Sequence, residues 1–187
     1  AVLGEMAATE GNPGLATGRC ADLPSAGRTV KNEELEMWGV GPEAAFVAAI
    51  ANLARLTYAQ PEELDLGEHG RLWSLQGDSF FTGSLALTLD RFDQFACEGG
   101  VFVSVPTRHA VLVLPFSGLP AMNTCSALMA ITQGMHRDGP GSVSAGVWGA
   151  RGGGWVGVSY QMSDSGVKVT PPREFVKVME EVAGRER

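Results

Sequence analysis

Residues 101–116, VFVSVPTRHAVLVLPF, contain two short apolar runs, 101–105 and 110–114, on either side of the segment Pro106–His109. Valine-rich runs of this length, joined by a few turn-forming residues, predict a β-hairpin. A second hairpin is predicted over 143–160, where small and apolar residues flank the glycine-rich turn RGGG. The sheet of this protein is therefore expected to be built from antiparallel neighbours.

Helical patterns lie around these hairpins. Apolar residues recur at helical spacing in several segments, and two further strands are indicated by short apolar runs. The predicted helices are 32–38, 42–56, 83–95, 119–134 and 171–184, and the added strands are 71–75 and 166–170. Because hairpins dominate and strict strand–helix alternation is absent, the pattern predicts an α+β fold. We expect an antiparallel sheet of four to six strands, with helices packed mainly on one face.

The domain organisation follows from composition. Residues 1–30 are rich in Gly, Ala, Thr and Pro and show no sustained period, which predicts a loosely structured N-terminal arm. Residues 31–187 are predicted to form a single α+β domain. The three cysteines are far apart and odd in number, which favours a reducing cytoplasm over a disulfide framework.

The net charge of −7 is unevenly distributed. Residues 1–70 contain 4 basic and 11 acidic residues, whereas residues 71–187 contain 10 of each. An acidic chain lacks the electrostatic footprint of a nucleic-acid binder and repels anionic lipid. No apolar stretch is long enough to span a membrane. A protein partner, basic in character, is therefore expected, with no nucleic acid and no membrane.

The segment GDSF at 77–80 resembles the nucleophile block of GDSL-type hydrolases. In that family the activating histidine comes from an Asp-x-x-His block near the C-terminus, and His69, His109 and His136 do not fit that pattern. Ser79 is therefore predicted to lie in a turn between a strand and a helix. Ser79, His109 and His136 remain the weak catalytic candidates, and a small hydrolase using Ser79 or a site near Arg108, His109 and His136 is one alternative.

Neither a metal site nor a cofactor is expected. No His-x₃-His or Glu-x-x-His spacing occurs. The glycine-rich segment 151–154 lies between two strands, whereas a phosphate cradle opens a helix. At the hairpin tip, Arg108 is a residue type that holds carboxylate or phosphate.

Several segments together resemble the YtpQ-like uncharacterised bacterial proteins. In the helical region the resemblance is carried by Trp38-Gly39-Val40 followed by Ala49, Asn52 and Leu53. It continues through GDSFFTGSLAL, GVFVSVPTRHAVLVLPF and GPGSVSAGVW, over about residues 30–160. The family usually has Asp where this chain has His109. Because the family has no settled activity, the resemblance implies a fold and a turn at GDSF but no reaction.

The sequence thus predicts a non-enzymatic, acidic partner-binding protein of bacterial type, comparable to an immunity protein or a secretion chaperone. A homo-oligomeric structural or regulatory protein, pairing through a sheet edge or a tryptophan face, is the other alternative. The predicted partner-binding residues are Glu33, Glu34, Glu36, Glu62, Glu63, Asp65, Arg108, Trp148 and Trp155.

Overall fold

The structure is a computed structural model that describes residues 20–23, 26–55, 60–118, 120–163 and 166–185. The chain divides into two compact units, Ala1–Tyr58 and Ala59–Arg187. The boundary between these units therefore lies after the first two helices, whereas the composition predicts a boundary at residue 30. Most of the predicted N-terminal arm lies outside the described residues.

The N-terminal unit contains a hairpin and two helices. Strands β1 (Cys20–Leu23) and β2 (Ala26–Thr29) pair antiparallel, and helices α1 (Asn32–Met37) and α2 (Pro42–Leu53) follow. Gly39 ends α1 with a φ of +64°, a left-handed conformation that glycine adopts without strain. Proline opens α2 at its first turn, where its missing N–H costs nothing. The buried residues Val30, Leu35 and Ala45 pack together beneath the helices.

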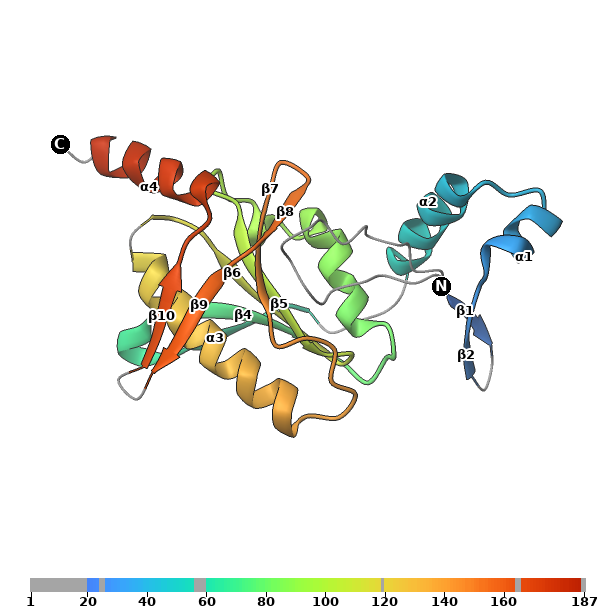
Figure 1. Ribbon diagram of the computed structural model, residues 1–187, viewed down its shortest axis with the longest axis horizontal. Helices are drawn as coiled ribbons and strands as arrows, with labels where there is room; N and C mark the ends of the chain where they lie inside the picture. Colours follow the sequence, from blue (N-terminus) through green and yellow to red (C-terminus); the bar gives the residue numbers. More distant parts are fainter. Residues whose placement is uncertain (1–19, 24–25, 56–59, 119, 164–165, 186–187) are drawn as a thin grey trace. The chain divides into compact units, whose positions relative to one another are not determined.

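The C-terminal unit is built on a six-stranded antiparallel sheet. The central strands of this sheet can be followed in Figure 1. Its strands lie in the order β3-β4-β6-β5-β7-β8. Their bounds are β3 Glu62–Asp65, β4 Arg71–Gln76, β5 Val101–Thr107, β6 Ala110–Pro115, β7 Val147–Arg151 and β8 Gly154–Gly157. A separate hairpin pairs β9 (Ser159–Ser163) with β10 (Gly166–Thr170). The predicted α+β class and antiparallel sheet are confirmed.

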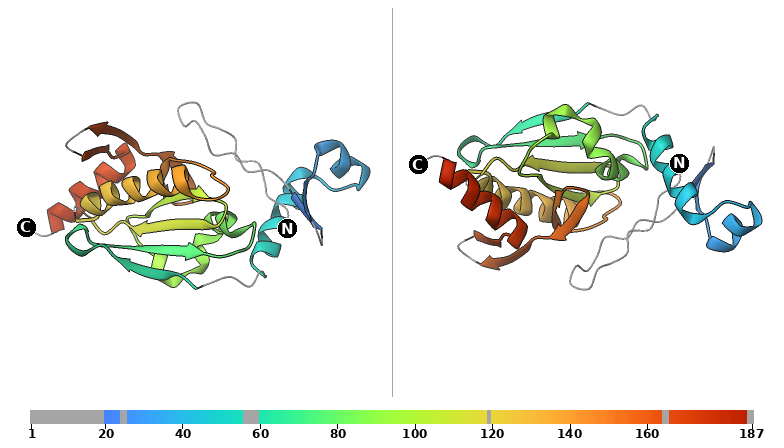
Figure 2. Two further views of the ribbon diagram at one scale, coloured as in Figure 1. Left: turned by 90° about the horizontal axis from the view of Figure 1, so that it is seen from below. Right: turned by 90° about the horizontal axis from the view of Figure 1, so that it is seen from above.

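Both faces of this sheet are covered (Figure 2). The α-helices α3 (Pro120–Asp138) and α4 (Arg173–Arg185) lie on one face, where Leu72 of β4 joins their core. The next residue, Trp73, points to the other face and meets Phe95 edge-to-face at 6.2 Å between ring centroids. That face carries the 3₁₀ helices η2 (Thr82–Arg91) and η3 (Asp93–Phe95), while η1 (Gly67–His69) joins β3 to β4.

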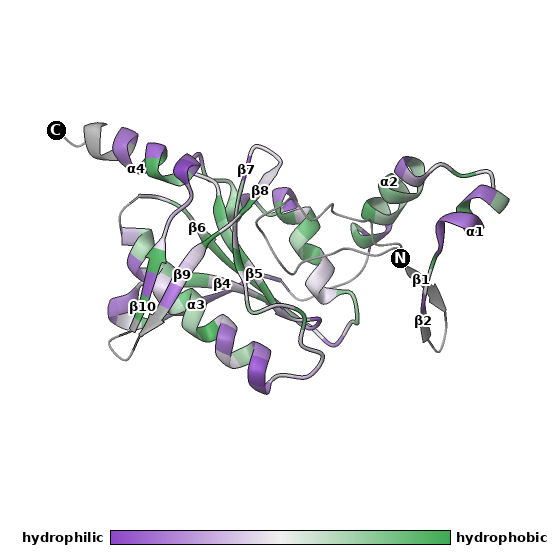
Figure 3. Ribbon diagram, viewed as in Figure 1, coloured by the Kyte–Doolittle hydropathy of each residue, from purple (hydrophilic) through white to green (hydrophobic). Residues whose placement is uncertain are grey.

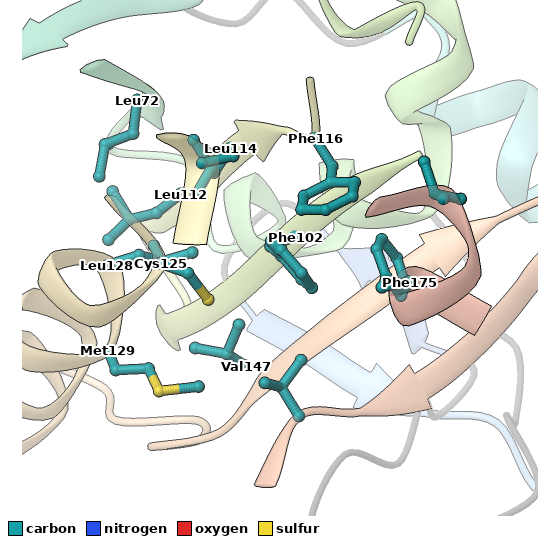
Figure 4. Packing of buried hydrophobic residues seen from close by; sticks show 13 residues of the cluster. Leu72, Phe102, Leu112, Leu114, Phe116, Cys125, Leu128, Met129, Val147 and Phe175 are labelled. Atoms are coloured by element: carbon teal, nitrogen blue, oxygen red, sulfur yellow. The ribbon is translucent and has the colours of Figure 1, made fainter. Parts of the chain in front are cut away.

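The core on the α-helical face centres on three aromatic rings (Figure 4). Phe102 of β5 stacks on Phe175 of α4, with centroids 4.6 Å apart and ring planes at 26°. Phe116 meets both rings edge-on, each at 5.3 Å. The central strands are correspondingly hydrophobic, and α3 and α4 alternate between hydrophobic and hydrophilic residues (Figure 3). The buried rings therefore fasten α4 to the middle of the sheet.

Candidate functional site

Residues 77–83, the segment GDSFFTG, lie against the tip of the β5–β6 hairpin. The backbone N–H of Gly77 donates to the carbonyl of His109 at 3.1 Å, and that of Gly83 donates to the carbonyl of Arg108 at 2.8 Å. A side chain at Gly83 would place its Cβ 2.9 Å from Cγ1 of Val105, so glycine permits this close approach. The loop is thus fastened to the hairpin tip at both of its glycines.

Ser79 stabilises the turn inside this loop. Its Oγ accepts a hydrogen bond from the backbone N–H of Phe81 at 3.2 Å, and its carbonyl accepts one from Oγ1 of Thr82 at 2.9 Å. In the described part of the chain no hydrogen bond joins the Ser79 hydroxyl to a histidine. A serine nucleophile needs such a base, so this geometry agrees with the turn interpretation of GDSF.

Arg108 and His109 hold one another at the hairpin tip. The Nε of Arg108 donates to Nε2 of His109 at 3.1 Å, while Nδ1 of His109 lies 3.2 Å from the carbonyl oxygen of Gly77. Because arginine can only donate, Nε2 of His109 is assigned as the acceptor. The ring proton is then on Nδ1, which donates a hydrogen bond to the carbonyl oxygen of Gly77. The guanidinium carbon of Arg108 lies 5.2 Å from the ring centroid of Phe80, which is 52 % exposed.

The end of α3 and the loop after it border this corner. The backbone N–H of Arg108 donates to Gly141 at 2.9 Å, and Thr107 and Ser142 form a β-bridge. The hydroxyl of Ser142 donates to the carbonyl of His136 at 2.5 Å. The structure therefore brings Ser79, Arg108 and His109 into one hairpin-tip site, defined here as residues 77–83, 108 and 109. The backbone of His136 lies at the border of that site.

On α1 the three predicted glutamates have different environments. Glu34 accepts the backbone N–H of Lys31 at 3.0 Å and pairs with Nη1 of Arg28 at 2.5 Å. These bonds, the backbone one first, lower the pKa of Glu34. Its carboxylate is committed to the start of the helix, in one half of a capping box. Glu33 and Glu36 are exposed and face solvent.

Beside these glutamates lies a group of exposed apolar side chains. Met37 is 76 % exposed, Trp38 is 54 % exposed and Val40 is 37 % exposed. The backbone N–H of Val40 donates to Leu35 at 2.9 Å, and that of Gly39 donates to Glu36 at 3.0 Å. This pair of bonds is a Schellman motif, which fixes the backbone that carries the apolar side chains.

We name the exposed residues Glu33, Glu36, Met37, Trp38 and Val40 the α1 surface. Residues three and four apart are neighbours on a helix, so the side chains of Glu36 and Met37 lie next to that of Glu33. Met37, Trp38 and Val40 are not among the partner-binding residues predicted from the sequence. An available signal was a tryptophan placed directly before a helix-ending glycine, outside the helical stripe.

The other predicted contact residues are distributed over the C-terminal unit. Arg71 forms ion pairs with two of the predicted acidic residues of β3. Its Nη1 lies 3.3 Å from Glu63 and its Nε lies 3.8 Å from Asp65. Glu62 is exposed on the same strand. Trp148 is only 3 % exposed and belongs to the core, so it offers no surface to a partner. Trp155 is half-buried and pairs across the hairpin with Ala150, so the two tryptophans are diagonal neighbours.

Trp155 also lines an open groove of about 840 Å³. Its lining includes Val101, Ala150 and Trp155 of the sheet, together with residues of η2, of η3 and the segment after it, and of the β7–β8 turn. Cys97 lines both this groove and a neighbouring cavity of about 180 Å³, and its Sγ donates to the carbonyl of Phe116 at 2.9 Å. The lining thus combines apolar side chains with the charged residues Asp90, Glu98 and Arg151.

Neither a metal centre nor a membrane span is found in the described residues. Within those ranges, no cluster of three or more His, Cys, Asp or Glu side chains is arranged to hold a metal ion. None of the helices in the same part of the chain is long and apolar enough to cross a membrane.

Comparison with known proteins adds no relative: no protein-family model, no curated protein and no solved structure matches this chain.

Proposed function

We propose that this protein is a non-enzymatic binding protein whose partner is a basic protein, in a role like that of a bacterial cytoplasmic immunity protein or secretion chaperone. The α1 surface carries the proposal, because Trp38 is 54 % exposed beside the solvent-facing carboxylates of Glu33 and Glu36. Tryptophan is among the residues that most often dominate the binding energy of protein interfaces. Carboxylates around such an anchor accelerate association with a basic partner.

The backbone under the α1 surface supports this role. Gly39 and Val40 close the Schellman motif, and Leu35 is buried on the opposite side of α1. The apolar side chains are therefore presented from a backbone that is ordered before binding. Less conformational entropy is lost when such a surface meets its partner.

The experiment is site-specific photo-crosslinking in a native lysate. A benzophenone amino acid replaces Trp38 in one variant and Ala51, an exposed residue of α2, in the control. We expect an adduct from position 38 alone, with a protein of basic isoelectric point, and a yield that falls as salt rises. An acidic partner, or equal adducts from both positions, would contradict the proposal.

Charge reversal then tests the role of the carboxylates. The variant Glu33→Lys/Glu36→Lys should lower the association rate of the purified partner, whereas Glu180→Lys/Glu181→Lys, two exposed residues of α4, is the matched control. Glu34 is left unchanged because it holds the start of α1. Equal losses in both variants would indicate a response to net charge alone.

The anchor residue is tested by equilibrium affinity. Trp38→Ala should weaken binding of the same partner by about 2 kcal/mol, or about 30-fold in Kd. An unchanged Kd would remove Trp38 from the interface.

A further inference from the structure

Arg108 is an exposed positive charge in an acidic chain. Elsewhere in the described residues, Arg28, Arg71 and Arg137 each form an ion pair with a glutamate or an aspartate. No ion pair to Arg108 is formed among those residues, although Asp78 lies in the adjoining loop. Its guanidinium is therefore an exposed positive charge that remains available.

The guanidinium is also held in place. His109 accepts from Nε at 3.1 Å, and the ring of Phe80 covers the guanidinium carbon at 5.2 Å. The described residues accept no hydrogen bond from the terminal Nη groups of Arg108, so these donors project as a planar fork. A planar fork matches the two oxygens of a carboxylate or phosphate, and holding it in advance reduces the entropy lost on binding.

The backbone around Arg108 is shaped to its side chain. Gly141 adopts a φ of +66°, and a Cβ there would lie 2.5 Å from Nε of Arg108. Glycine is therefore needed where the side chain crosses the 139–142 loop. Backbone bonds from Gly77, Gly83 and Arg108 already fasten the loops together, so the terminal nitrogens of the guanidinium are not needed for that task.

We propose that the hairpin-tip site binds an oxyanion, a carboxylate or a phosphate, on the guanidinium fork of Arg108. Phe80 excludes water from one face of the guanidinium, which strengthens charge-assisted hydrogen bonds at its edge. The exposed half of the same ring offers apolar contact beside the charge. The ligand class is therefore an oxyanion carried on an aromatic or apolar body. This site is independent of the proposed α1 surface.

The test is a titration of the full chain followed by the ¹⁵N-edited NMR signal of the Arg108 Nε–H. The probes are benzoate, acetate, phenyl phosphate and inorganic phosphate at constant pH, with sodium chloride as the control for ionic strength. We expect saturable shifts, with benzoate binding more tightly than acetate and phenyl phosphate more tightly than inorganic phosphate. The tighter of the two aromatic probes identifies carboxylate or phosphate as the natural group.

Variants separate binding from folding. Arg108→Gln should weaken binding at least about tenfold, and Arg108→Lys, which keeps the charge but lacks the fork, about fivefold. Arg151→Gln, which alters an exposed arginine of the β7–β8 turn, should leave the affinity unchanged. The backbone amide signals of each variant report whether it is folded. If Arg108→Gln does not fold, the probe affinities of Arg108→Lys and Arg151→Gln are compared instead. The proposal then requires weaker binding by Arg108→Lys than by Arg151→Gln.

The proposal is overturned if sodium chloride shifts the Arg108 Nε–H signal as much as the oxyanion probes do and none of the shifts saturates. It is equally overturned if a folded Arg108→Gln or Arg108→Lys variant binds the probes as tightly as the original chain.

Discussion

Replacing Gly149 by alanine tests how α4 is anchored to the sheet. An ideal Cβ at Gly149 would lie 2.2 Å from Cε2 and 2.6 Å from Cζ of Phe175, far inside the normal carbon–carbon contact distance. Phe175 is only 1 % exposed, and its ring is held by Phe102 at 4.6 Å and by Phe116 at 5.3 Å. Because the ring has no free space, we expect Gly149→Ala to lower the free energy of unfolding by about 1–3 kcal/mol.

The same geometry predicts strong coupling between the two positions. Phe175→Ala alone should cost about 3–5 kcal/mol, because it leaves a cavity between the helix and the sheet. In that background the methyl group added by Gly149→Ala enters the vacated space, so the second substitution should cost almost nothing. A double-mutant cycle should then give a coupling free energy of about 1–3 kcal/mol.

The assay is urea unfolding of the four chains, followed by tryptophan fluorescence with the midpoint and slope fitted together. Gly134→Ala is the control, because a Cβ at that position of α3 meets nothing within 4 Å. That substitution should raise stability by about 0.5–1 kcal/mol through helix propensity. Additive effects of the Gly149 and Phe175 substitutions would refute the proposed anchoring of α4.

Three further predictions concern single residues. Burial raises the pKa of the Cys125 thiol to about 12, so iodoacetamide should label it in urea but not in the folded protein, as mass spectrometry would detect. The hydrogen bonds that Glu34 accepts from the backbone N–H of Lys31 and from Arg28 lower its pKa, so its contribution to stability is present above the ordinary pKa of a glutamate. That contribution is lost as the pH falls through the lower folded-state pKa, and acid unfolding of α1 by circular dichroism should respond less to pH in Glu34→Gln. Gly100 has a φ of +84° and a Cβ there would lie 2.5 Å from a carbonyl oxygen of β7, so Gly100→Ala should cost about 2 kcal/mol or more in the urea assay.

The hairpins were predictable because their signals are local. Valine-rich runs on both sides of 106–109 became β5 and β6, which pair directly. Gly152 and Gly153 both adopt positive φ, at 56° and 81°, as the tight turn between β7 and β8 requires. In each case the turn residues and the apolar runs lie within a few positions of one another. All the residues that determine the hairpin can therefore be recognised in one short stretch of the sequence.

Where the determinant is distant in sequence, the predictions were incomplete. Strand β3 is not among the strands predicted from the sequence, because carboxylates have low strand propensity. Charged residues are tolerated there because β3 is an edge strand and Arg71 lies opposite its acidic side chains. Helix α3 continues past Gly134, the expected end, to Asp138. Its packing on the sheet outweighs the small propensity cost of one glycine.

Val47 shows the same limit in the N-terminal unit. Val47 is an apolar residue of α2, yet it is 63 % exposed, and Ala45, Ala49 and Leu53 are the buried positions. Apolar residues surround much of this helix, so periodicity alone does not select which stripe is buried. The choice depends on what packs against the helix, which one sequence does not specify.

The hairpin-tip site shows why a motif does not reveal what lies next to it in the folded chain. GDSF resembled a nucleophile block through its side chains, yet its position depends on the backbone of the glycines at its two ends. The backbone N–H groups of Gly77 and Gly83 donate to the backbone carbonyls of His109 and Arg108. Because every residue has a backbone carbonyl, the sequence does not show which residues will be the partners. These bonds also place Phe80 against the guanidinium of Arg108, which is the residue proposed to bind a ligand at this site. The Ser79 hydroxyl caps its own turn and has no histidine partner within the described residues, whereas the guanidinium of Arg108 is positioned there without forming an ion pair, so the ligand titration is directed at Arg108.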